Sequence, residues 1–190
     1  MFKPFPRGLA AFALAGTLTL SACDSTEPGG GPGEEELITE VTLTLTDSDG
    51  NDVTITGSDP EGAGLTFSPA SVALQAGTSY TGTIEFDAPG ESVTEEIEEE
   101  AEEHRIAYSL EPGGVGTVTV TDRESDYTSD DENGGDFVVG LRFRVDVAAG
   151  ASGSGTMRAI LYHFDDEPKT SDTATSDEID IEVPFPVTVQ

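Results

Sequence analysis

Apolar and polar residues alternate over long stretches of this chain, and this alternation constrains the fold more than any other feature. Val41, Leu43 and Leu45 are separated by threonines, and residues 137–147 and 179–189 repeat the pattern at greater length. Successive side chains of a β-strand point to opposite faces, so a period of two predicts a strand with one buried face. The sequence therefore predicts a mainly β protein.

Shorter strands complete the predicted fold. They are expected at residues 53–56, 72–75, 78–86, 105–110, 115–121 and 156–164. Turn sequences such as Asp49-Gly50 separate them. About eight strands with short connections predict an antiparallel β-sandwich over residues 37–190, with an up-and-down barrel of lipocalin type as the alternative. Pro184 and Pro186 share the outward parity of the last strand, which predicts a sheet edge there.

One segment, residues 92–104, lacks the alternation and is rich in glutamate. Ser92 and Glu95 have the spacing of a capping box, although Thr94 is a rival cap. Apolar residues recur at helical spacing and form one narrow stripe. The members of this stripe are Val93, Ile97, Ala101 and His104. The segment predicts one short helix inserted between strands.

The strands at residues 136–147 and 156–164 are neighbours in sequence, and we expect them to form a hairpin centred on Ala151. Arg144 would then face Arg158, and like charges directly opposite each other destabilise a sheet. We hypothesise that carboxylates of the predicted helix neutralise these arginines. The apolar stripe of the helix would cover the neighbouring Ile160, Tyr162 and Phe164. The alternative is an anion-binding patch open to solvent.

The chain has two histidines, and acidic residues lie near both. Glu100 and His104 are four residues apart, so a helix would place them on one face. His163 precedes Asp165 and Asp166 at the end of a strand. Imidazole and carboxylate groups bind zinc and other divalent metals. These residues make His104, Glu100 and His163 the candidate metal ligands. In the alternative interpretation, His104 ends a solvated helix and His163 is a hydrogen-bonded rim residue.

Motifs of catalysis are missing from the sequence. Residues 150–154 lack the final glycine of a nucleophile elbow, and neither a P-loop nor a dinucleotide fingerprint is present. Carboxylates are too numerous to single out an acid–base pair. We therefore predict a protein that is not an enzyme, with no catalytic residues and no cofactor other than a divalent metal. A hydrolase ranks last.

The charge of the chain excludes one class of partner. It has 38 acidic and 8 basic residues, and the first 22 residues carry two of those bases and no acid. A surface this acidic cannot bind the phosphates of a nucleic acid. Self-repulsion destabilises the compact state unless salt screens it. We interpret the charge as adaptation to a salty medium, with a cation-rich surface role as the alternative.

The start of the chain has the features of an export signal. Lys3 and Arg7 precede an apolar run over residues 9–20, which ends in a Leu-Ser-Ala-Cys sequence at Cys23. The run is shorter than the about 20 residues that span a bilayer, and its organisation is that of a cleavable signal peptide. Cys23 is the single cysteine, so it has no disulfide partner.

This ending resembles the lipobox of bacterial lipoproteins. The resemblance implies that Cys23 is lipidated and becomes the mature N-terminus, held in the membrane by several acyl chains. The chain then divides into a signal peptide (1–22), a lipidated cysteine with a flexible acidic tether (23–36) and the β domain (37–190). We expect a lipid-anchored protein of the cell envelope, in the outer membrane, on its periplasmic or surface side.

Two broader resemblances bear on function. Residues 74–84 resemble the strand–turn–strand of immunoglobulin-like lipoprotein domains, which implies an immunoglobulin-like sandwich. The whole chain is similar to small β-rich lipoproteins of unassigned function, in which a Glu-rich segment ends in Glu-His. That similarity implies a non-enzymatic binding or receptor-accessory module, with an outer-membrane receptor or another envelope protein as partner. The alternative is a divalent-metal-binding lipoprotein.

Overall fold

A computed structural model describes residues 37–129, 134–164 and 168–190. The predicted leader, Cys23 and the tether lie outside these residues. Within them the chain forms eleven strands, one α-helix and one short 3₁₀ helix, which confirms the mainly β class. Eight of the strands have five residues or more, and three have two or three. Among the described helices, none has the length and apolar character needed to cross a bilayer.

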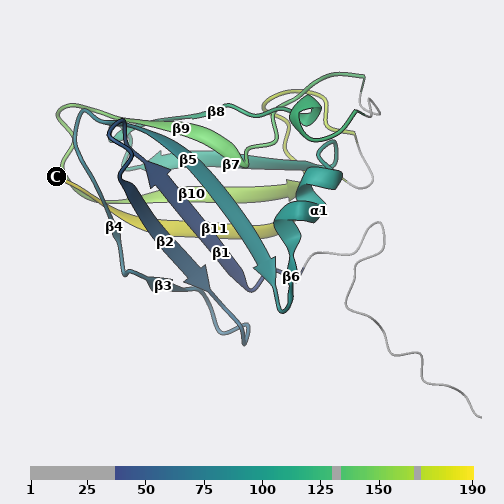
Figure 1. Ribbon diagram of the computed structural model, residues 1–190, viewed down its shortest axis with the longest axis horizontal. Helices are drawn as coiled ribbons and strands as arrows, with labels where there is room; N and C mark the ends of the chain where they lie inside the picture. The colour runs from purple at the N-terminus through teal and green to yellow at the C-terminus, as the bar shows by residue number, and fades with distance from the viewer. Residues whose placement is uncertain (1–36, 130–133, 165–167) are drawn as a thin grey trace, which may run out of the picture.

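The strands form two sheets (Figure 1). Sheet A has the order β3-β2-β1-β5-β9-β8, with β6 paired to β5, and all its pairs are antiparallel. Its strands are β1 (Glu40–Thr46), β2 (Asp52–Ser58), β3 (Thr66–Ser68), β5 (Ser79–Ala88), β6 (Glu91–Ser92), β8 (Gly116–Val120) and β9 (Arg142–Val147). The turn between β1 and β2 is closed by Asp47, whose carboxylate accepts hydrogen bonds from the backbone of Asp49 and Asn51.

Sheet B has the order β4-β11-β10-β7. Its strands are β4 (Val72–Leu74), β7 (His104–Glu111), β10 (Gly153–His163) and β11 (Glu178–Val189). The pair β4–β11 is parallel, so the fold is not wholly antiparallel as predicted. Because β4 pairs only with Val187–Val189, the part of β11 that contains Pro184 and Pro186 is bonded to β10 alone. The prolines therefore lie at a sheet edge, as their missing N–H requires.

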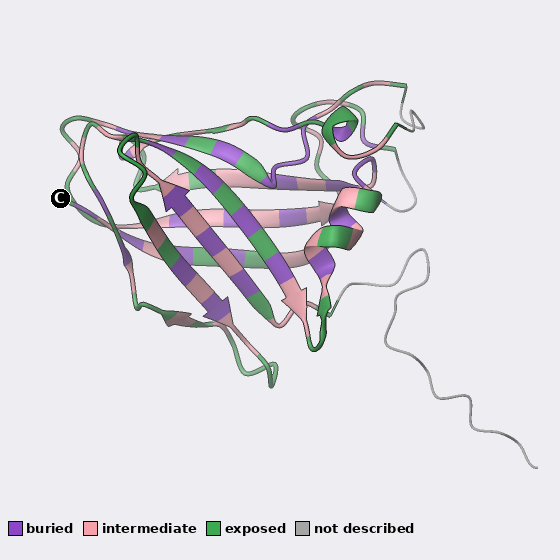
Figure 2. Cartoon of the chain, in the orientation of Figure 1, coloured by how far each residue is buried: buried purple, intermediate pink, exposed green. Residues whose placement is uncertain are grey.

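The two sheets pack against each other around one hydrophobic core. Buried and outward residues alternate along the long strands, which appears as banding in Figure 2. The inward residues of both sheets belong to the same cluster, to which Leu43, Phe86 and Phe143 contribute from sheet A and Met157 and Phe185 from sheet B. The inward residues of the period-two pattern therefore form the core between the two sheets, as predicted, and the domain is sandwich-like.

The predicted hairpin between residues 136–147 and 156–164 is wrong. Strand β9 lies in sheet A between β5 and β8, whereas β10 lies in sheet B between β11 and β7. Residues 148–152 therefore cross from one sheet to the other. Arg144 faces Thr81 and Thr119, and Arg158 faces Ser109 and Pro184, so the predicted clash of like charges does not arise.

The strand predicted from residue 137 begins only at Arg142, because the preceding segment joins the two sheets at one end of the sandwich. The carbonyl of Val139 accepts a hydrogen bond from Ile106 in sheet B, and that of Leu141 accepts one from Ile84 in sheet A. Between them Gly140 has φ +109°, and a Cβ there would lie 2.8 Å from the carbonyl oxygen of Ile106. Only glycine fits this crossing.

The predicted helix is present but shorter, and it packs elsewhere. Helix α1 spans Val93–Glu99, and His104 belongs to β7. Val93, Ile97 and Ala101 are buried in the main core rather than over residues 160–164, and α1 contacts β5 at the end of the sandwich (Figure 1). Ser92 makes no side-chain cap. Instead the Thr94 hydroxyl bonds to the backbone N–H and carbonyl of Phe86 in β5, at 2.7 and 3.1 Å.

Candidate functional site

The two histidines meet inside the protein. His104 is the first residue of β7 and His163 the last of β10, and the two are direct partners across the strand pair. Their rings stack with centroids 4.5 Å apart and planes 22° apart. The exposed fractions are 0% for His104 and 5% for His163. The alternative interpretation of His104 as the end of a solvated helix is therefore wrong.

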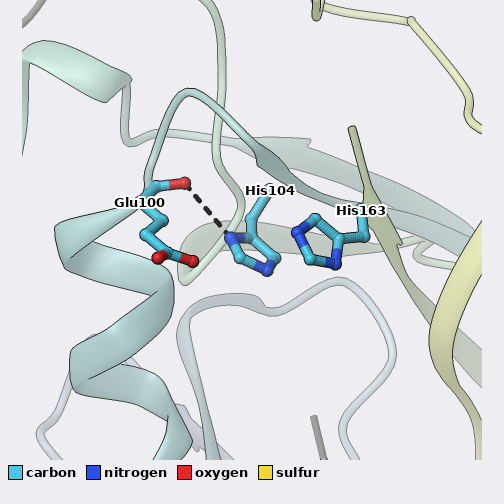
Figure 3. Close-up of side chains that lie close together, drawn as sticks. All are labelled: Glu100, His104 and His163. Atoms are coloured by element: carbon cyan, nitrogen blue, oxygen red, sulfur yellow. Dashed lines mark hydrogen bonds between the residues drawn. The ribbon is translucent and has the colours of Figure 1, made fainter. Parts of the chain in front are cut away.

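Glu100 joins this pair from the turn that follows α1. Its backbone carbonyl lies 3.1 Å from Nδ1 of His104, and Figure 3 shows its carboxylate on the same side of that ring. One ligand atom from each of Glu100, His104 and His163 lies within 4.8 Å of the others. The structure thus brings the three predicted residues together. Their approach comes from a turn leading into a strand, not from a shared helix face.

A third strand adds a carboxylate that the sequence did not indicate. Asp180 of β11 has a side chain that is 1% exposed. One of its oxygens lies 3.8 Å from Nε2 of His104, and the other lies 3.6 Å from Nδ1 of His163. We call Glu100, His104, His163 and Asp180 the histidine cluster.

Glu103 connects the histidine cluster to solvent. Its carboxylate lies 3.8 Å from Nε2 of His163 and is 38% exposed, and its backbone carbonyl accepts a hydrogen bond from Phe164. The cluster therefore lies just below the surface, and the turn before β7 forms its rim. Asp165 and Asp166, which the sequence placed beside His163, lie outside the described residues.

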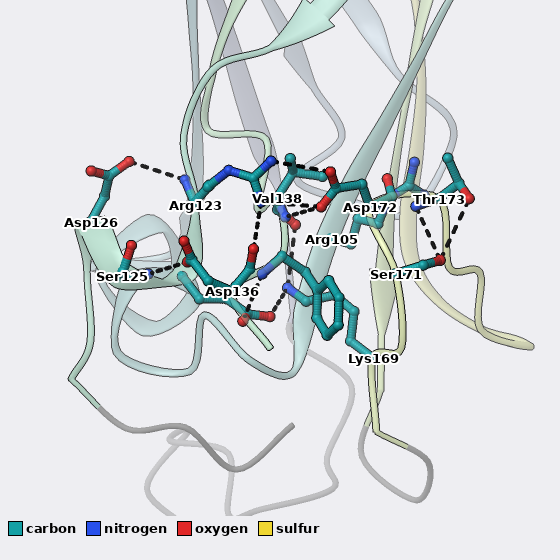
Figure 4. Close-up of polar contacts among 12 residues, drawn as sticks. Arg105, Arg123, Ser125, Asp126, Asp136, Val138, Lys169, Ser171, Asp172 and Thr173 are labelled. Carbon is teal, nitrogen blue, oxygen red and sulfur yellow. Dashed lines mark hydrogen bonds and ion pairs between the residues drawn. The ribbon is translucent and has the colours of Figure 1, made fainter. Parts of the chain in front are cut away.

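A second buried polar group lies next to the first. The ammonium of Lys169, with 0% exposure, donates to the carbonyls of Ala101 and His104 and pairs with Glu124 at 2.8 Å. It also donates to the carbonyl of Val138 (Figure 4). Burial lowers the pKa of Lys169, and the hydrogen bond and charge of Glu124 oppose that change. We call Lys169, Glu124 and these three carbonyls the lysine cluster. It fixes the backbone that carries His104.

The expected arginine patch is not open to anions. Arg142 pairs with Asp126 at 3.0 Å and lies over the ring of Tyr127. Arg144 pairs with Asp146 in its own strand at 2.5 Å. Arg158 pairs with Glu182 and lies 3.8 Å from Glu111. Each of these arginines has a carboxylate from a strand or loop beside it, so neither the anion site nor the proposed helix docking is needed to balance their charge.

Asp180 and Lys169 are the residues that sequence reasoning missed. Asp180 has the outward parity in the alternation of the last strand, so the local pattern hides it. Lys169 did leave a signal, because it is the only lysine after Lys3 in a chain with 38 acidic residues. A lone lysine among so many carboxylates indicates a specific structural role.

The histidine cluster combines two imidazoles with carboxylates in a largely buried place. This donor set suits zinc and similar transition metals, whereas calcium and magnesium prefer oxygen ligands alone. Searches of protein-family models, curated proteins and solved structures found no match for this chain. The chemistry of the site therefore rests on its own residues.

Proposed function

We propose that this protein is an exported lipoprotein whose β domain binds a divalent metal of the zinc class. One observation carries the proposal: Glu100 and the chain's two histidines, which come from different segments, place ligand atoms within 4.8 Å of one another. Two imidazoles and one carboxylate are ligands of the types that zinc takes in proteins.

The ring arrangement makes a specific demand on metal binding. The lone pair of an imidazole nitrogen lies in the plane of the ring, and the two rings are only 22° from parallel. The lone pairs of two such rings lie in nearly parallel planes, so one ion can lie in the plane of both rings only after one ring turns about its χ2 bond. We therefore expect metal binding to reorient His163, whose Nε2 lies beside the exposed Glu103.

The proposal keeps the wider prediction of a non-enzymatic, membrane-anchored binding or accessory module. Its support is the lipobox-like sequence at Cys23, the missing catalytic motifs and the two packed sheets, which suit an immunoglobulin-like scaffold. A metal held at the end of such a scaffold would be a bound ligand or a structural ion rather than a catalytic centre. A receptor or other envelope protein is the partner that the resemblance to lipoproteins implies.

The test is metal binding by the complete chain in high salt. Thermal stability and bound metal are measured with zinc, copper, calcium and a chelator. We expect zinc to raise the melting temperature with one ion bound per chain, and calcium to have little effect. His163→Phe keeps a stacked ring but removes both nitrogens, so it should abolish the zinc effect.

A surface variant serves as the matched control. Asp52→Asn removes an exposed carboxylate from β2, in sheet A, and should leave the zinc effect unchanged. Equal small shifts with every divalent ion, in all three proteins, would mean that the ions only screen the negative charge. That result would contradict a metal site and would direct the search toward a protein partner.

A further inference from the structure

We infer that Asp180 positions both imidazoles of the histidine cluster for metal binding, as a carboxylate that contacts the ligands and not the ion. This inference rests on the proposed function. It assigns to Asp180 the role of a positioning residue, and it states which nitrogen of each histidine faces the metal.

A β-bulge places Asp180 in the cluster. Leu161 of β10 pairs with Ile181 of β11, but the next residue, Tyr162, pairs with Ile179, so Asp180 has no partner of its own in the ladder. The extra residue reverses the parity of the strand at this point. As a result the carboxylate of Asp180 points inward while Ile179 is 44% exposed. Bulges of this kind often re-aim a side chain beside a functional site.

The two oxygens of Asp180 are divided between the two rings. One lies 3.8 Å from Nε2 of His104, and the other lies 3.6 Å from Nδ1 of His163. The remaining nitrogens have different neighbours: Nδ1 of His104 lies 3.1 Å from the carbonyl of Glu100, and Nε2 of His163 lies 3.8 Å from the carboxylate of Glu103. Asp180 therefore lies beside one nitrogen of each ring, and the turn that carries Glu100 and Glu103 lies beside the other nitrogen.

This division sets the chemistry of the site. A carboxylate beside one ring nitrogen stabilises the N–H form there, which leaves the lone pair on the opposite nitrogen. The ligand atoms would then be Nδ1 of His104, Nε2 of His163 and the carboxylate of Glu100. In the contact with the Glu100 carbonyl, Nδ1 of His104 is the donor, so on binding its proton would move to Nε2, beside Asp180, and Nδ1 would take the ion. His163 would turn about χ2 with its Nδ1 kept beside Asp180. Glu103 lies at the exposed side, where an ion enters.

The nitrogen assignment can be measured directly. The complete chain, labelled with ¹⁵N at histidine, is loaded with ¹¹³Cd²⁺ as an NMR-active substitute for zinc. Scalar coupling between cadmium and Nδ1 of His104 and Nε2 of His163 is the expected result. Coupling to the two nitrogens that face Asp180 would overturn the inference, because the ion would then lie on the Asp180 side.

A substitution tests the positioning role separately. Asp180→Asn should weaken zinc binding about 10- to 100-fold while one ion still binds, the range typical of residues that contact metal ligands. Asp122→Asn is the control, because Asp122 is also fully buried but accepts hydrogen bonds from Gly140, Arg142 and Tyr127 instead. It should lower stability without changing zinc affinity.

The outcomes separate this inference from the proposed function. Equal zinc affinity in the wild-type chain and in Asp180→Asn would overturn the inference and leave the metal site intact. An equal loss of affinity in the Asp122→Asn control would also overturn it, since any loss of a buried carboxylate would then suffice. Absence of zinc binding by the wild-type chain would overturn the proposed function and this inference with it.

Discussion

The lysine cluster and the histidine cluster lie side by side and are both largely buried, but their geometry differs. In the lysine cluster, the ammonium of Lys169 has four oxygen atoms at 2.7–3.3 Å, which are hydrogen-bond and ion-pair distances. In the histidine cluster, the contacts of Asp180 with the two rings are 3.6 and 3.8 Å. Both clusters share His104, the first through its carbonyl and the second through its ring.

This difference indicates what each cluster is for. The three protons of Lys169 have acceptors in place, so the lysine cluster is a finished structural element that fastens residue 169 to the turn before β7. The histidine cluster places one ligand atom from each of Glu100, His104 and His163 within 4.8 Å of the others, a spacing that suits ligands converging on an ion. Burial alone therefore does not identify a functional site, whereas burial combined with ligand spacing does.

The largest expected loss of stability comes from removing the cation of the lysine cluster. Lys169→Met leaves the carboxylate of Glu124, which is 2% exposed, without its cation. Removal of one partner from a buried ion pair costs about 3–5 kcal/mol, so the free energy of unfolding should fall by that amount. Chemical denaturation in high salt measures it.

A double variant separates the ion pair from simple loss of packing. Lys169→Met combined with Glu124→Gln removes both charges and should recover much of the loss. If the double variant is as unstable as Lys169→Met, the charge of Glu124 is not the reason for the destabilisation.

Zinc should produce the next largest effect, and only through the histidine cluster. At free zinc 100 times above the dissociation constant, the free energy of unfolding should rise by about 2.7 kcal/mol. Denaturation with zinc and with a chelator measures the difference. The same increment is expected in the double variant of the lysine cluster, and a smaller one there would show that the two clusters act as a unit.

The hydrogen bond from Tyr127 to Asp122 provides a further test of stability. The hydroxyl of Tyr127 donates to the buried carboxylate of Asp122 at 2.7 Å, so Tyr127→Phe should cost about 2 kcal/mol. Tyr108→Phe is the matched control, because that hydroxyl donates to the neutral carbonyl of Gly140 and should cost about 1 kcal/mol. Equal losses would mean that the charge of Asp122 adds nothing. Neither substitution should alter zinc affinity.

The smallest effect is expected on the outer face of sheet A. Arg144 and Asp146 are neighbours on β9, and the arginine side chain is 58% exposed. Exposed ion pairs contribute little because solvent and salt screen them, so Arg144→Ala should leave stability in high salt unchanged within error. A clear loss would show that surface pairs, not only buried clusters, stabilise this acidic domain.

Local patterns predicted the elements of this fold well, and long-range pairing poorly. The strands at residues 41–46, 105–110 and 179–189 and the apolar stripe of Val93, Ile97 and Ala101 follow from periodicity alone. The hairpin through Ala151 failed because a short connection can join strands in one sheet or cross between two sheets. Only the neighbours of β9 and β10 decide between these arrangements.

The candidate site likewise shows which features are local in sequence and which depend on long-range pairing. The sequence by itself determined that the protein is mainly β, that it carries two histidines with glutamates nearby, and that a single lysine follows Lys3 among many acids. The tertiary structure decided that His104 and His163 are cross-strand partners and that a bulge turns Asp180 toward both rings. The physical reason is that side-chain direction in a strand is local, but register and bulges depend on the neighbouring strand, which the local sequence does not specify.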